Sequence, residues 1–126
     1  MKQIISTPKA PQAVGPYSQA NVASGRAIYV AGQVSLDPIS GKPVQGDIEA
    51  QTTRVFENIA AILQASGASF KHVVKVNVYL SDVANFAKMN EVYRRYFVSD
   101  YPARTTIQAV LPPGFLLEAD AVAYIE

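Results

Sequence analysis

The run Val74-Lys75-Val76-Asn77-Val78-Tyr79-Leu80 decides the fold, because aliphatic residues alternate in it with longer polar or aromatic ones. A period of two is typical of a β-strand, whose successive side chains point to opposite faces of a sheet. One face should pack into a core, and it consists of Val74, Val76, Val78 and Leu80. The other face carries Lys75, Asn77 and Tyr79, which suit neither a core nor open solvent. A partner subunit is a reasonable cover for that second face.

Two helices are predicted on either side of this strand. The first follows Asp47, a plausible N-cap, and repeats apolar residues at helical spacing from Ile48 to Leu63. Gly67 should end it, and the second helix should begin near Asp82 or Asn85. Further strands are predicted at 27–34, 103–110 and 116–124. The order of these elements predicts one α+β domain over residues 1–126, with two helices on one face of a mixed sheet.

The composition narrows the classes of function. The 126 residues carry a net charge of +1, from 11 Lys and Arg against 10 Asp and Glu, without a charge block. Neither nucleic-acid binding nor membrane binding is therefore favoured. No cysteine is present and His72 is the single histidine, interpreted as a surface residue, so we expect no disulfide and no metal site. The first residues lack the apolar core of a signal peptide, and a cytoplasmic location is the simplest expectation.

Arg104 is the main candidate functional residue. In an alternating strand it shares a face with Thr106 and Gln108, so three polar side chains should line a cleft or an interface. A guanidinium can grip a carboxylate with two parallel hydrogen bonds. Two interpretations stay open, namely a clamp for a small acid and a structural ion pair across a subunit contact.

Glu118 is the candidate proton carrier. It lies on the last predicted strand, where a carboxyl group could act as an acid or base or could simply be solvated. If the last two strands form a simple hairpin, Glu118 shares the face of Arg104 only with an odd loop or a bulge. Alternatively, the two strands are not neighbours, and the site is assembled between subunits.

Tyr17 and Gly32 are secondary candidates. The loop Gly15-Pro16-Tyr17-Ser18-Gln19-Ala20 either places a phenol and backbone amides at a cleft or forms an ordinary turn. Gly32 interrupts an apolar strand, which indicates a bulge or a backbone N–H exposed to a ligand. Tyr93 and Tyr96 are interpreted as aromatic residues that pack the second helix onto the sheet.

Taken in order, these segments resemble the RidA (YjgF-type) family over essentially the whole chain. The matching segments are 10–20, 31–33, 37–41, 51–59, 74–80, 86–93, 102–106, 111–112 and 117–123. The resemblance implies a chorismate-mutase-like α+β fold with a mixed six-stranded sheet and two helices packed on one face. It also implies a homotrimer with clefts between subunits.

The resemblance further implies an activity, the hydrolysis of 2-imino acids such as 2-iminopropanoate and 2-iminobutanoate to 2-keto acids and ammonia, without cofactor or metal. Arg104 would hold the substrate carboxylate, and Glu118 would activate water and then help protonate the leaving nitrogen. Tyr17 and the Gly32 region would shape the cleft.

The chain departs from the family pattern in three places, of which the first two bear on secondary polar contacts and substrate range and the third on how Glu118 meets Arg104. Ala31 stands where many deaminase members have Ser, and Thr106 stands where many have Cys. The segment 104–111 is also one residue shorter than in some members. The alternatives are a non-enzymatic acid-binding or regulatory trimer and an RNA-directed role, which the near-neutral charge disfavours.

Overall fold

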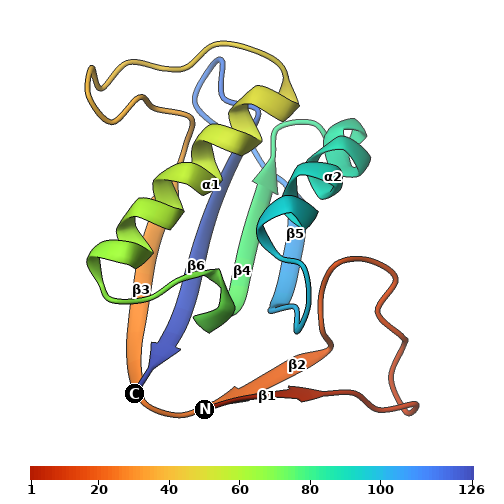
Figure 1. Ribbon diagram of the computed structural model, residues 1–126. Coiled ribbons are helices and arrows are strands. Elements are labelled where there is room, and N and C mark those ends of the chain that lie inside the picture. The colour runs from red at the N-terminus through yellow and green to blue at the C-terminus, as the bar shows by residue number, and fades with distance from the viewer.

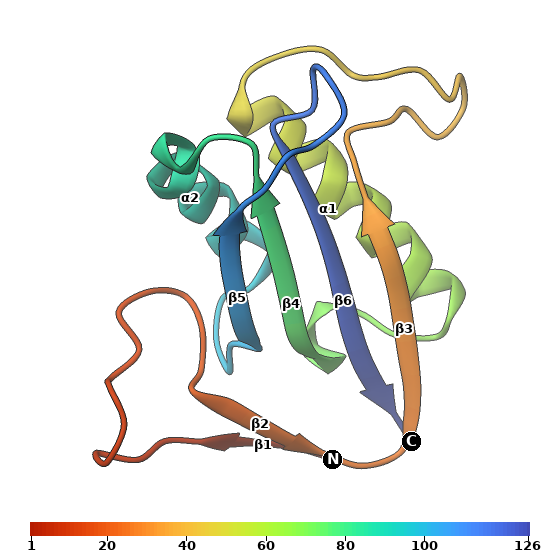
Figure 2. The same ribbon diagram turned by 180° about the vertical axis from the view of Figure 1, so that it is seen from behind.

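A four-stranded sheet carries both helices on one face and leaves its other face open (Figures 1 and 2). The computed structural model describes all residues 1–126. The strands are β1 (Lys2–Ile5), β2 (Ala20–Ala23), β3 (Arg26–Gln33), β4 (Val73–Leu80), β5 (Ala103–Gln108) and β6 (Leu117–Ile125). The α-helices are α1 (Ile48–Ala65) and α2 (Phe86–Tyr96), and the short 3-10 helices are η1 (Phe70–His72) and η2 (Val83–Asn85).

The main sheet has the strand order β3-β6-β4-β5. β4 and β5 run parallel, and β6 is antiparallel to both of its neighbours. β1 and β2 pair only with each other, as an antiparallel hairpin beside the end of the main sheet (Figure 2). The expectation of a single six-stranded sheet is therefore wrong. The six strands form two sheets, because Gly25, with φ at +117°, turns the chain between β2 and β3.

Both helix starts follow from capping side chains. Asp47 Oδ1 accepts a hydrogen bond from Ala50 N at 2.9 Å, which confirms Asp47 as the N-cap of α1. Gly67, with φ at +80°, follows the end of that helix, as predicted. Asp82 caps η2, and α2 begins directly after Asn85, so each predicted start residue begins one of two consecutive helical segments.

The core lies between the helices and the sheet. Val76, Val78 and Leu80 of β4 are fully buried there, as the alternation predicts. The prediction for Val74 is wrong, because the pairing of β4 with β6 shifts between Val73 and Lys75, and Val73 takes the buried position. The expected packing role of the two tyrosines is confirmed: Phe56 lies 5.5 Å from the Tyr93 ring and 5.6 Å from the Tyr96 ring.

The second face of the sheet, which we call the open face, is covered by no other part of the chain (Figure 2). Asp120 accepts hydrogen bonds from Asn77 at 2.9 Å and from Tyr79 at 3.3 Å across this face. Tyr29, whose neighbour on β6 belongs to the same face, is 77% exposed, and Ile107 is 49% exposed. Neither helix combines the length and apolar character needed to cross a bilayer.

Candidate functional site

Arg104 lies on the edge strand β5 and points toward the helices. Its neighbour in the sheet is Val76, which is buried under the helices, and paired residues share a face. Arg104 Nη1 donates a hydrogen bond to Asn90 Oδ1 of α2 at 2.7 Å. Its guanidinium carbon lies 4.7 Å from the ring centroid of Tyr93, 5.6 Å from that of Phe86 and 5.8 Å from that of Tyr17. The guanidinium is thus held by one amide and three aromatic rings.

This cation has no carboxylate partner within the chain. The two ion pairs of the structure join the N-terminal amine to Glu126 and Arg95 to Glu49, and neither includes Arg104. Burial lowers the pKa of Arg104, and the nearby Arg94 acts in the same direction, although the group stays a cation at physiological pH. A half-buried charge without a counter-ion is costly. An anion bound beside it would lower that cost.

A cavity of about 230 Å³ lies beside the guanidinium, and its lining consists of Tyr17, Phe86, Arg104 and Thr106. Thr106 points to the same face as Arg104, because its partner in β4 is the buried Val78. Its Oγ1 is buried and has no hydrogen-bond partner. The structure therefore brings three of the sequence-predicted residues, Tyr17, Arg104 and Thr106, around one small polar cavity.

The Gly15–Ala20 loop reaches this cavity because it is tied to the start of β5. Ser18 N donates to Pro102 O at 3.1 Å, and Ser18 forms a parallel bridge with Ala103. The Gln19 side chain fixes the preceding loop, accepting from Thr7 N and donating to Pro11 O, each at 2.6 Å. Of the two interpretations of this loop, the structure therefore agrees with the one that places the Tyr17 phenol at a cleft.

Glu118 lies on the opposite face of the same sheet. It is paired with Tyr79, which is paired with Ile107 of β5, and all three belong to the open face. No hydrogen bond within the chain uses the Glu118 carboxylate. Since β4 separates β6 from β5, the backbones of the two strands are about 10 Å apart, from the ordinary strand spacing. Arg104 and Glu118 therefore do not meet within one copy of the chain.

Gly32 leaves room for Glu118. A Cβ placed on Gly32 would lie 2.5 Å from Glu118 Oε2, so only glycine allows this close approach. The pairing of β3 with β6 shifts between Val30 and Gln33, which confirms the bulge that Gly32 indicates. Ala31 lies exposed in the same bulge. The predicted residues thus form two groups, one with Arg104 under the helices and one with Glu118 on the open face.

Phe86 and Asn90 contact Arg104 but are not among the residues predicted for the site from the sequence. A signal for both existed, because Phe86, Asn90 and Tyr93 follow one another at helical spacings of four and three. An amide in an otherwise aromatic stripe of α2 needs a polar partner. Only the fold could identify that partner as Arg104.

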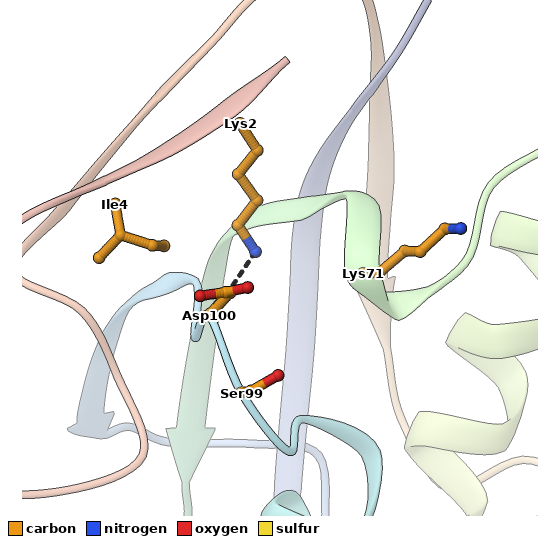
Figure 3. A pocket seen from close by; sticks show the side chains of 5 residues that line it. All are labelled: Lys2, Ile4, Lys71, Ser99 and Asp100. Atoms are coloured by element: carbon orange, nitrogen blue, oxygen red, sulfur yellow. Dashed lines mark hydrogen bonds between the residues drawn. The ribbon is translucent and has the colours of Figure 1, made fainter.

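The largest cavity, of about 460 Å³, lies elsewhere, beside β1 (Figure 3). It is lined by Lys2, Ile4, Lys71, Ser99 and Asp100. Lys2 Nζ donates to the main-chain oxygen of Asp100 at 2.6 Å, and burial lowers the pKa of Lys2. This cation already has a partner, and the Asp100 carboxylate offsets its charge. The cavity is a weaker anion site than the one at Arg104. No three His, Asp or Glu side chains gather to hold a metal ion.

Comparison with known proteins identifies the family. The family model described as Endoribonuclease L-PSP matches residues 7–125. A RutC family protein of Pyrococcus abyssi is 53% identical over 126 residues, 99% of this chain and 98% of that protein. The human protein named 2-iminobutanoate/2-iminopropanoate deaminase is 45% identical over 124 residues, 98% of this chain and 90% of that protein. The crystal structure of RidA from an Antarctic Psychrobacter species is 45% identical, with a TM-score of 0.76 and coverage of 98% of this chain and 99% of that one. The chain therefore belongs to the endoribonuclease L-PSP family, the RidA (YjgF-type) family that its motifs resemble.

Proposed function

We propose that the protein hydrolyses small 2-imino acids, such as 2-iminopropanoate and 2-iminobutanoate, to 2-keto acids and ammonia. The observation that carries this proposal is Arg104, a half-buried cation without a counter-ion beside a cavity of about 230 Å³. A carboxylate on a three- or four-carbon acid is an anion of suitable size and charge. The name of the human relative, 2-iminobutanoate/2-iminopropanoate deaminase, supports the same substrate class.

In the proposed reaction, the guanidinium N–H groups that Asn90 leaves free donate to the substrate carboxylate. The oxygen of a water molecule attacks the imine carbon while the Glu118 carboxylate accepts a proton from it. Protonated Glu118 returns its proton to the nitrogen of the resulting carbinolamine, and the C–N bond then breaks, so that ammonia leaves while the hydroxyl group gives its proton to the Glu118 carboxylate and becomes the carbonyl. An iminium carbon is already electrophilic, so positioning and one proton shuttle suffice. No cofactor takes part.

We further propose that the working form is a homotrimer with its sites between subunits. Arg104 and Glu118 lie on opposite faces of one sheet, so a complete site needs Arg104 from one copy and Glu118 from another. The open face, with Tyr29 at 77% and Ile107 at 49% exposure, offers the apolar surface for such a contact. In a closed ring, each copy gives Arg104 to one cleft and Glu118 to the next.

The activity is tested by generating 2-aminoacrylate in situ and following the release of keto acid with the purified protein. We expect release faster than in buffer, and an Arg104→Ala variant at the buffer rate. Release at the buffer rate with the wild-type protein would rule out the deaminase. A keto acid that binds to a chain without turnover would instead support the alternative of a non-enzymatic acid-binding or regulatory trimer.

Complementation tests the shared site. Arg104→Ala and Glu118→Ala chains are each expected to be inactive. Co-expressed in equal amounts, they should assort at random, so that each mixed trimer has one cleft with both intact residues and roughly a quarter of all clefts are intact. Recovery of about that share of wild-type activity supports a site between copies. Lack of any recovery in verified mixed trimers would place both residues in one copy.

Because the matching family is named after an endoribonuclease, RNA cleavage is tested as well. With a net charge of +1, the chain has little electrostatic attraction for a phosphate backbone. His72, its one histidine, already accepts a hydrogen bond on Nδ1 from Ser69 N at 3.0 Å. We expect no cleavage of single-stranded RNA.

A cytoplasmic location stays a prediction.

A further inference from the structure

The hydrogen-bond partner of Arg104 is a neutral side chain. Asn90 Oδ1 accepts from Arg104 Nη1 at 2.7 Å, and this is the one hydrogen bond that the guanidinium makes within the chain. A side-chain amide accepts through a partial charge and does not cancel a cation, whereas a carboxylate would do so. We propose that Asn90 is a positioning residue that fixes the Arg104 guanidinium while leaving its charge free for a ligand carboxylate. This inference rests on the proposed role of Arg104 as the carboxylate clamp.

The other contacts of the guanidinium follow the same rule. The rings of Tyr93, Phe86 and Tyr17, at 4.7, 5.6 and 5.8 Å, attract a cation through their quadrupoles without carrying a negative charge. Burial raises the pKa of the Tyr93 phenol well above its usual range, so this hydroxyl stays protonated and neutral. Burial lowers the pKa of Arg104, and among its neighbours that are charged at neutral pH, Arg94 is another cation that lowers it further. Every group that holds the clamp therefore leaves its positive charge uncancelled.

The geometry fixes the direction of the guanidinium as well. Asn90 and Tyr93 are three residues apart on α2, so they hold one nitrogen and one face of the guanidinium from the same side. The remaining N–H donors are left for the cavity that Arg104 shares with Thr106. A planar guanidinium held at one edge presents its other edge for two parallel hydrogen bonds to a carboxylate.

A purely structural role is the competing explanation, in which Asn90 simply ties α2 to β5. The substitution Asn90→Asp separates the two roles, because it keeps the size of the side chain and its acceptor oxygen but adds a negative charge. If Asn90 only links α2 to β5, the added charge should leave the stability of the protein unchanged or raise it. If Asn90 is a positioning residue, the same charge should weaken ligand binding, because the new carboxylate would occupy Arg104 as an internal ion pair and exclude the ligand carboxylate.

Pyruvate, a stable keto acid of the product class, serves as the probe, with binding measured by calorimetry or NMR titration on the full chain. We expect Asn90→Asp to weaken pyruvate binding about tenfold or more, with an unchanged or higher Tm, since a charge-assisted pair replaces a neutral one. Asn90→Ala should weaken binding less, because Arg104 keeps its charge but loses its orientation. Lys71→Ala, which removes a cation lining the cavity of Figure 3, is the control and should bind as the wild type does.

Wild-type affinity in a folded Asn90→Asp variant would overturn the inference. If that variant does not fold, Asn90→Ala decides, because wild-type affinity in it also contradicts a positioning role. The test does not depend on turnover. If the wild-type chain binds pyruvate but releases no keto acid from imines, the proposed deaminase activity is contradicted and the role of Asn90 is not. If the wild-type chain binds no pyruvate, both the carboxylate-binding role of Arg104 and the positioning role of Asn90 are contradicted.

Discussion

The two faces of the main sheet are made by the same strands, yet they hold their polar groups in opposite ways. The helix-covered face is largely aliphatic, and the polar side chains on its strand β5 include Arg104 and Thr106, which line one cavity. The open face is a polar network centred on Asp120, with apolar residues such as Ile107 exposed around it. On the first face Arg104 has no counter-ion, and on the second the Glu118 carboxylate has no hydrogen-bond partner within the chain. The comparison shows that one chain carries both halves of the proposed site on opposite faces of its sheet and cannot bring them together by itself.

The largest loss of activity should follow a substitution of Arg104 on the helix-covered face. Arg104→Ala removes the proposed carboxylate clamp, and kcat/KM should fall about a thousandfold or more, as expected when a bidentate charged contact is lost. The Tm should stay close to that of the wild type, because the buried cation has no carboxylate to lose. The assay follows keto-acid release, and Arg26→Ala on the exposed start of β3 is the control. Equal activities in the two variants would remove Arg104 from the site.

The next effect comes from the open half. Glu118→Gln keeps the size of the side chain but removes the proton acceptor, and kcat should fall about a hundredfold or more. Pyruvate binding should stay within about twofold, because the carboxylate is held by Arg104 from the other group of residues. Activity and binding are measured on the same preparation. A variant that loses binding and keeps turnover of bound substrate would reverse the two roles.

These two predictions also show what the sequence could and could not supply. Alternation assigned Val76 and Val78 to the core, and it placed Arg104 and Thr106 on one face, because those inferences need only the period of a strand. It misplaced Val74, because a bulge shifts the register and leaves no local signature. The local pattern likewise cannot tell that β1 and β2 leave the main sheet.

The relation between Arg104 and Glu118 depends on a long-range choice. The last two strands are consecutive in the chain and could have formed a hairpin, but β4 inserts between them and pairs parallel with β5. Which strand lies between two others is decided by the packing of whole elements and not by either strand alone. The two residues were therefore identifiable as candidates, while their separation on opposite faces was not.

A smaller effect is expected at the bulge that holds Glu118 in place. Gly32→Ala would set a methyl group 2.5 Å from Glu118 Oε2, and this flexible carboxylate would move aside at little cost in stability. Because a displaced base is poorly aligned with its water, kcat should fall about tenfold to a hundredfold. Gly41→Ala in the 37–42 turn is the control for activity alone, because nothing lies near the added methyl group but a φ of +72° makes alanine strained there. Unchanged kcat in a folded Gly32→Ala variant would show that the position of Glu118 is not critical.

The smallest effect should come from Thr106, where stability and activity are expected to move in opposite directions. Its Oγ1 is buried without a partner, so Thr106→Val replaces an unsatisfied hydroxyl by a methyl group of similar size. Unfolding of the chain should cost up to about 1 kcal/mol more, since a buried donor without a partner is itself destabilising. If the hydroxyl also donates to a bound ligand in the cavity beside β5, KM should rise a few-fold while kcat changes little. Denaturant titration and steady-state kinetics on one preparation measure both. A less stable variant would show that the Thr106 hydroxyl has a hydrogen-bond partner within the fold. In that case Arg104 would be the one polar group of the cavity left free to bind a ligand.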